Sequence, residues 1–271
     1  MKNVNKKVSV VTVTLECEAD DAPEKKHRDE ILKKVVQTFG KEDIILLPAG
    51  FYDVTDSKEE IRTTEEISRL LSETKSKSVV CLGIDVGNDT QLAVAIDKSG
   101  IRAKGRKFFP TDEEKKYLNS AKSFDSREPE FFDNGEPGHG RFVECKGKQF
   151  YLAVCYDSYG IREYEISKPE KTNAVLNLVH GFTRSGEGSG ISYFIRYGFG
   201  GGSRHWKCPV FGAAVLFNRE VPKRWQPGFK CREGVENLQS ITYADNLLEY
   251  SKQDCNISTE YEKAFCWLST I

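Results

Sequence analysis

The sequence predicts an α/β protein with a mixed sheet system. β-branched and apolar runs typical of strands alternate with amphipathic runs typical of helices in the first part of the chain. Two hairpin patterns follow, and no repeat or long low-complexity linker divides the 271 residues. We therefore expect a single domain over residues 1–271, which at this size buries about three quarters of its unfolded-chain surface and needs no disulfide for stability.

Helices and strands are expected to alternate up to residue 84. Apolar residues such as Ile31, Val35 and Phe39 recur at helical spacing, and Gly40 follows as a stop. Short apolar runs predict buried strands, as in the run that closes at Pro48. The expected elements are a strand at 8–15, a helix at 24–39, a strand at 43–47, a helix at 64–75 and a strand at 78–84.

The rest of the chain predicts mainly strands. Gly100 and Gly147 mark the turns of two hairpins, and a long polar segment over 111–140 lies between them. The glycine-rich stretch 198–203 is expected to be a flexible loop that interrupts any helix before it. The expected elements are hairpins 91–96/101–109 and 141–145/149–155, strands at 174–180 and 209–218, a short helix at 192–197, a strand at 240–243 and a helix at 244–250, with an indistinct tail.

The composition narrows the class of protein. With 38% hydrophobic and 30% charged residues, the chain is too apolar for a disordered protein and too charged for a membrane protein. Forty basic against 41 acidic residues give a net charge of -1, which provides no electrostatic case for a nucleic-acid or membrane partner. Because acidic residues rather than a cleavage site follow the first apolar run, we expect that run to be the first strand of a cytoplasmic protein.

The eight cysteines are scattered, without a C-x-x-C pair or the ligand spacing of a zinc site. Most are expected to be reduced thiols that pack in the interior, which is the usual role of a free cysteine. Cys155 stands apart because it ends the apolar strand 150–154, at the edge where α/β proteins gather their ligands. Its position alone does not distinguish a nucleophile from a thiol that only packs.

Four segments occur in a suggestive order: 44–52, 101–110, 141–157 and 174–180. The first is a buried strand that ends at a proline, the second carries Arg106-Lys107 and ends at Pro110, and the third ends in Cys155-Tyr156-Asp157. This layout, over about residues 8–218, resembles the carbon–nitrogen hydrolase (nitrilase/amidase) superfamily. The resemblance implies a divergent member with a four-layer α-β-β-α sandwich of two mixed sheets. It also implies a small amide or nitrile substrate, no cofactor or metal, and a homo-oligomer.

The same resemblance assigns roles to two kinds of side chain. Cys155 would attack the substrate carbon, and a lysine of the preceding hairpin would stabilise the oxyanion that develops. Lys107 is the preferred lysine and Lys104 the alternative; the two positions point to opposite faces of a strand, so only one of them fits. The competing interpretation is that these residues are merely the solvated basic edge of a sheet.

The general base is where the sequence departs from the family. The family's glutamate follows the proline of the first segment, and this chain has Ala49 there. Glu114 and Glu113, just after Phe-Phe-Pro, are the candidate substitutes, and Asp53 is a poorer one. On sequence alone, a solvated helix start explains the two glutamates better than a catalytic role does. His180 is a candidate acid or base, although a lone histidine is more often structural.

Two functions therefore remain open. The first is a cysteine-dependent hydrolase or acyltransferase acting on C–N bonds of small amides or nitriles. The alternative is a catalytically inactive nitrilase-fold homologue that binds a small molecule or a protein. Ala49 favours the alternative, whereas Cys155 in its sequence context favours the enzyme.

Overall fold

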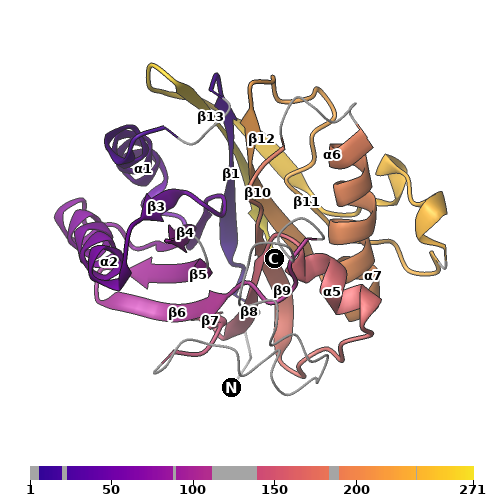
Figure 1. The fold of residues 1–271 in the computed structure, drawn as a ribbon. Coiled ribbons are helices and arrows are strands. Elements are labelled where there is room, and N and C mark those ends of the chain that lie inside the picture. Colours follow the sequence, from indigo (N-terminus) through magenta and orange to yellow (C-terminus); the bar gives the residue numbers. More distant parts are fainter. Residues whose placement is uncertain (1–5, 20–22, 88–89, 112–138, 183–188, 236) are drawn as a thin grey trace.

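The computed structural model describes residues 6–19, 23–87, 90–111, 139–182, 189–235 and 237–271. Thirteen strands are found in these ranges (Figure 1). They are β1 (Ser9–Cys17), β2 (Ile44–Leu46), β3 (Tyr52–Val54), β4 (Val79–Val86), β5 (Thr90–Asp97), β6 (Gly100–Arg106), β7 (Phe142–Cys145), β8 (Lys148–Val154), β9 (Thr172–Leu178), β10 (Val210–Phe217), β11 (Gly228–Phe229), β12 (Tyr250–Ser258) and β13 (Glu262–Thr270).

The helices of the described residues lie on two sides of these strands. They are α1 (Lys25–Phe39), α2 (Ser57–Glu73), α5 (Asp157–Glu163), α6 (Ser189–Tyr193), a π-helical stretch (Phe194–Gly200), α7 (Gly201–Trp206) and 3-10 turns at Leu238–Ser240 and Tyr243–Asp245. None of these helices is long and apolar enough to cross a membrane.

Hydrogen-bonded neighbours follow the order β6-β5-β4-β2-β1-β10-β9-β8-β7. Strand β1 pairs in parallel with β2 through residues 10–12 and with β10 through residues 14–17, so it joins two sheet halves. Parallel pairing continues through β10, β9 and β8, which brings the carboxyl ends of β8 and β9 to one edge. The carboxyl ends of parallel strands are where α/β proteins usually bind their ligands, so this edge is the place to look for a functional site.

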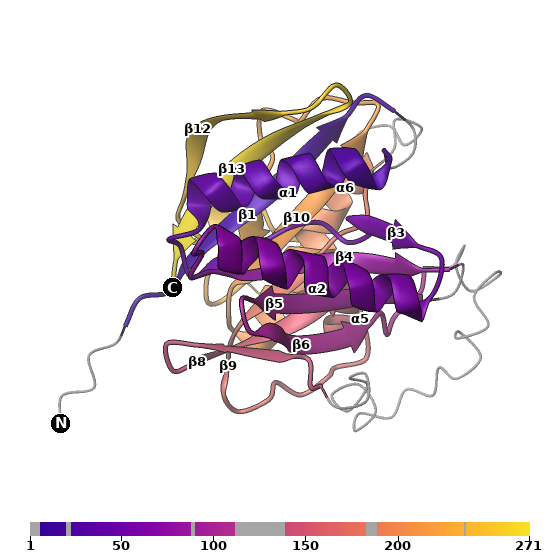
Figure 2. The same cartoon turned by 90° about the vertical axis from the view of Figure 1, so that its left-hand side faces the viewer.

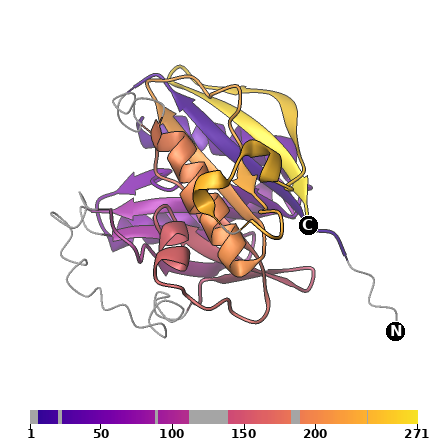
Figure 3. The ribbon, with the colours of Figure 1, turned by 90° about the vertical axis from the view of Figure 1, so that its right-hand side faces the viewer.

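The two sheet halves form the inside of a sandwich. Helices α1 and α2 cover the outer face of the half that contains β4–β6 (Figure 2), and α5–α7 cover the half that contains β8–β10 (Figure 3). Between the halves, Ala93 and Ala103 share a buried core with Phe150 and Leu152. The predicted α-β-β-α sandwich is thus confirmed, with its two mixed sheets continuous through the β1–β10 pair.

Helix α2 begins earlier than the predicted Thr64. The carboxylate of Asp56 accepts hydrogen bonds from the backbone N–H groups of Lys58 (2.8 Å) and Glu59 (2.9 Å), which caps the helix. The inward positions of its first turns are Glu60, Thr63 and Thr64, which are polar, so apolar periodicity does not reveal these turns.

The glycine-rich stretch 198–203 is not the predicted loop. It continues α6 through the π-helical stretch into α7, and its glycines are buried. The helix lies close to the sheet because Gly212 of β10 has no side chain. A Cβ there would come within 2.0 Å of the Phe199 ring. Glycine on both surfaces therefore allows close packing here, an effect that propensity alone cannot reveal.

The predictions for the C-terminal part were wrong. Residues 240–250 form 3-10 turns and irregular structure instead of a strand and a helix, and the tail forms the hairpin β12–β13. Strand β13 pairs antiparallel with β1 over its whole length. Its apolar alternation is hidden because the buried Glu262 forms an ion pair with Arg28 of α1, with 2.7 Å between Oε2 and Nε. A sequence pattern assigns a charged residue to the exposed face of a strand, because charged side chains are rarely buried.

Candidate active site

Cys155 occupies a sharp turn between a strand and a helix. It follows the last residue of β8, its φ is +50°, and α5 begins two residues later at Asp157. This left-handed conformation costs a residue with a Cβ about 1–3 kcal/mol and persists only where neighbours hold it. The Cys155 N–H donates to the Leu178 carbonyl (2.6 Å), and its own carbonyl accepts from Asn177 Nδ2 (3.2 Å). The turn resembles the strained elbow that presents the nucleophilic serine in α/β-hydrolases.

The two candidate lysines face different ways. Lys104 Nζ lies 2.8 Å from Glu60 Oε1 of α2, on the outer side of the sheet. Lys107 follows the end of β6, and its Nζ lies over the Tyr156 ring, 6.0 Å from the centroid. Its charge also acts on the Cys155 thiol. The geometry therefore brings Lys107, and not Lys104, to the cysteine.

The Cys155 side chain is buried and nevertheless acidic for a thiol. Burial, with 7% of the residue exposed, would by itself raise the pKa of the thiol. The Lys107 ammonium and hydrogen bonding from the His180 side chain and backbone more than offset this, and the pKa lies below its ordinary value. Such a shift favours the thiolate, which is the nucleophilic form.

His180 lies just beyond the end of β9 and connects the cysteine to Asp85 of β4. Its Nε2 is 3.2 Å from Asp85 Oδ1, and the two side chains are 23% and 26% exposed. Burial would lower the pKa of the imidazole, but Asp85 and the contact with the Cys155 thiol raise it to about 9. The imidazole therefore interacts both with the Asp85 carboxylate of one sheet half and with the Cys155 thiol of the other.

Ala49 lies in the wall of a cavity of about 710 Å³ that Asp85 and His180 also line. The next residue, Gly50, has a φ of +56°, and a Cβ there would lie 3.2 Å from both Asp85 Oδ2 and His180 Cδ2. The position where the family carries its glutamate is thus next to the Asp85–His180 pair. Cys155 and Lys107 are not among the described residues that line this cavity.

A buried carboxylate fastens the lysine segment to the cysteine turn. Asp157 is fully buried; its Oδ1 accepts from the N–H groups of Phe108 (2.8 Å) and Phe109 (2.9 Å), and its Oδ2 from Val154 N–H (2.9 Å). Arg141 Nη2 lies 3.5 Å from Oδ2. Burial raises the pKa of Asp157 against the opposing effects of Arg141 and the backbone donors. The residues that follow Lys107 are thus tied to the residues that flank Cys155.

Two sequence predictions cannot be placed. Glu113 and Glu114 lie outside the described residues. Asp53, the poorer candidate, lies opposite Asp85 in the register of β3 and β4, and it lines the cavity. Burial and the Asp85 charge raise the pKa of the Asp53 carboxyl. Sequence reasoning missed Asp85, although a signal existed: like His180, it is polar and directly follows a buried apolar run.

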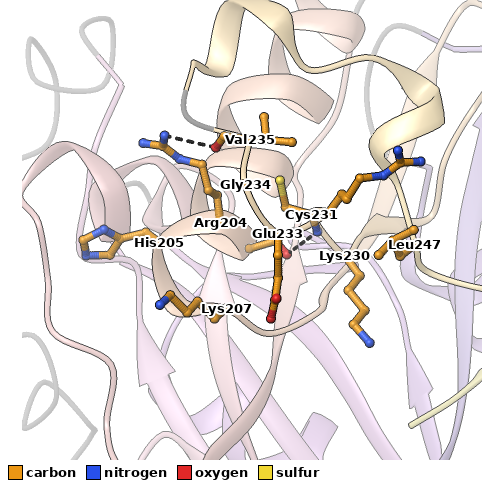
Figure 4. A pocket seen from close by; sticks show the side chains of 11 residues that line it. Arg204, His205, Lys207, Lys230, Cys231, Glu233, Gly234, Val235 and Leu247 are labelled. Atoms are coloured by element: carbon orange, nitrogen blue, oxygen red, sulfur yellow. Dashed lines mark hydrogen bonds between the residues drawn. The ribbon is translucent and has the colours of Figure 1, made fainter.

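A second cavity of about 870 Å³ lies away from these residues (Figure 4). Arg204, Lys207, Lys230, Arg232 and Glu233 line it, together with apolar and small side chains. The Arg204 guanidinium donates to the Val235 carbonyl at 3.4 Å, which is a contact within the chain's own fold. None of the residues predicted to act in catalysis lines this cavity among the described part of the chain.

No family model and no curated protein matches the sequence. The structure is similar to a double mutant of the amidase from Nesterenkonia sp. AN1 in complex with acrylamide. The TM-score is 0.57 and the identity 13%, over 97% of this chain and 90% of that one. It is also similar to Saccharomyces cerevisiae Nit3, a member of branch 10 of the nitrilase superfamily, with a TM-score of 0.53 and 12% identity over 97% and 89% of the two chains. Identity this low speaks for the fold alone, and the protein has the fold of the nitrilase superfamily.

Proposed function

We propose that the protein is a divergent carbon–nitrogen hydrolase, folded as one domain, that uses Cys155 to cleave or transfer the acyl group of a small amide. The single observation that carries this proposal is the placement of Cys155, a buried thiol held at a strand–helix turn where the Lys107 charge and the His180 ring act on it and lower its pKa. A thiol that only packs has its pKa raised by burial, as Cys208 does, with a pKa of about 12.

The remaining geometry supports nucleophilic attack on a carbonyl. The thiolate would add to the amide carbon, and the Lys107 ammonium would stabilise the oxyanion that forms on the carbonyl oxygen. The acrylamide complex of the similar amidase supports a small amide as the substrate class. Glu114 or Glu113 as the supporting carboxylate stays a proposal from the sequence.

Ala49 favours a different function. Without the family's glutamate, the chain could retain the fold and bind a small molecule or a protein without turnover. The two functions differ in one measurable property, because only an enzyme needs an activated thiol.

The homo-oligomeric state and the cytoplasmic location are further proposals. Analytical ultracentrifugation measures the oligomeric state, and fractionation of the source cells measures the location.

Alkylation of Cys155 tests the proposed function. A model thiol with a pKa near 8.5 is only about 0.3% thiolate at pH 6. We expect iodoacetamide at pH 6 to modify Cys155 roughly tenfold faster or more, because Lys107 and His180 favour the thiolate. Peptide mapping by mass spectrometry measures the rate at each cysteine.

The control for this experiment is within the chain. Hydrogen bonding to Cys266 lowers the pKa of the half-buried Cys255 to about 7, so this second reactive thiol must be followed separately. The variant Cys155→Ala should lose the fast phase and retain the Cys255 phase. Modification of Cys155 no faster than a model thiol would contradict the enzyme and favour the binding protein.

A further inference from the structure

The site already described has a nucleophile and a cation but lacks the family's base. General acid–base catalysis contributes roughly 10²- to 10⁴-fold to such reactions, so an amidase without it would be badly impaired. Ala49 cannot move a proton, and its own surroundings show what could. The residues beside it in the cavity wall are Asp85 and His180, which contact each other. The His180 ring also interacts with the Cys155 thiol.

We propose that His180, oriented by Asp85, is the general acid and base of this site and replaces the carboxylate that Ala49 lacks. The inference rests on the proposed function of Cys155. In this proposal Cys155, His180 and Asp85 act together on the fold in which the family uses a glutamate as the base.

The ring nitrogens have different partners, which defines their roles. Nε2 faces Asp85 Oδ1 at 3.2 Å, so its N–H donates to the carboxylate. Nδ1 is buried and has no hydrogen-bond partner of ordinary geometry among the described residues. It is therefore the nitrogen available to the thiol, which interacts with the ring. Catalytic hydrogen bonds are often long or poorly aligned before substrate binds.

Three elements converge on the imidazole. Asp85 comes from β4, Cys155 from the end of β8 and Lys107 from the end of β6. The Lys107 charge disfavours the imidazolium, whereas Asp85 and the thiolate favour it, and the favourable interactions prevail. Further charged groups on the cavity wall are Asp53, Glu24 and Lys25. These contacts therefore favour a resting pair of thiolate and imidazolium.

The proton balance follows from this resting pair. The thiolate forms a C–S bond to the amide carbon, and the Nδ1 proton of His180 passes to the leaving nitrogen as the C–N bond breaks. The neutral imidazole then takes a proton from water, whose oxygen forms a C–O bond to the acyl carbon. The C–S bond breaks, which releases the acid and restores thiolate and imidazolium.

The substitutions His180→Gln and Asp85→Asn test the proposal with two substrates. A simple amide needs a proton on its leaving nitrogen, whereas p-nitrophenyl acetate releases a stable phenolate without one. In His180→Gln we expect amide acylation to fall about 10²- to 10⁴-fold, ester acylation to fall much less, and the acyl-enzyme to accumulate. Intact-protein mass spectrometry detects that species. His205→Gln is the matched control, since His205 of α7 hydrogen-bonds the Ile166 carbonyl and neither Cys155 nor Asp85.

The pH dependence of amide acylation distinguishes an Asp85 that tunes His180 from an Asp85 that only stabilises the fold. Because amide acylation needs the imidazolium, its rate in the wild type should fall as pH rises through about 9. In Asp85→Asn the group that raises the pKa of His180 is lost, so this limb should move to lower pH. A merely structural Asp85 would change the amplitude and leave the limb in place.

A third readout needs no substrate. Thiolate absorbance at 240 nm, taken as the difference from Cys155→Ala, should titrate at higher pH in His180→Gln than in the wild type. Unchanged titration, or amide cleavage by His180→Gln within about threefold of wild type, would overturn the role of His180. If the wild type cleaved neither the amide nor the ester while the titration shift was present, the proposed amidase would be rejected and the thiol–imidazole pair retained.

Discussion

Replacing Lys107 by methionine should lower kcat/KM for amides by about 10²- to 10³-fold. A preorganised donor aimed at the developing oxyanion is worth this much in other acyl-transfer sites. The substitution should also slow alkylation of Cys155 at pH 6, because the ammonium is a main cause of the lowered thiol pKa. Methionine retains the length of the side chain, so packing against Tyr156 changes little.

Lys104→Met is the matched control for this prediction. It removes a cation of the same strand region whose partner is Glu60 of α2. Because the pair is only slightly exposed, its loss should cost stability between the ~1 kcal/mol of a surface pair and the ~3–5 kcal/mol of a buried one. The rate of Cys155 alkylation should stay unchanged. If Lys104→Met impaired acylation as much as Lys107→Met, the assignment of the oxyanion site would be wrong.

The fold was predictable because its signals are local. Strand β8, helix α1 and both hairpins show their apolar pattern within a few residues, and the order of elements implied the sandwich. The hairpin β12–β13 was not predictable from pattern, because β13 is stabilised by pairing with β1 and by the buried Glu262–Arg28 ion pair. Such long-range partners leave no local periodicity.

The candidate site was predictable only in part. Cys155 could be singled out because it ends an apolar strand. The choice of Lys104 or Lys107 as its partner depended on which of the two faces the cysteine, and the sequence left that open. The contact between His180 and Asp85 joins β9 to β4, strands that lie on different sheet halves. No spacing in the sequence encodes that contact. Only the folded sandwich shows that the loss at Ala49 is accompanied by a histidine and a carboxylate next to it.

Replacing Asp157 by asparagine should cost the protein several kcal/mol of stability. The change leaves Arg141 buried without its counter-charge and turns an amide N–H toward the N–H of Val154. Breaking a buried pair in this way costs about 3–5 kcal/mol, and the lower end is expected because Arg141 still donates to the Tyr151 hydroxyl at 2.8 Å. For a chain of this size that loss lowers Tm by on the order of 10 °C, measured by calorimetry.

Asp157→Asn should also impair chemistry at temperatures where the variant is folded, because Asp157 holds the segment after Lys107 against the turn at Cys155. Glu262→Gln provides the comparison, since it breaks an equally buried pair with Arg28 between α1 and β13. The two variants should lose similar stability, yet only Asp157→Asn should slow alkylation of Cys155 at pH 6. Equal alkylation rates in both would mean that the contact of Lys107 with the thiol does not depend on this carboxylate. The alignment of cation and nucleophile would then have to come from the packing of β6 against β8 alone.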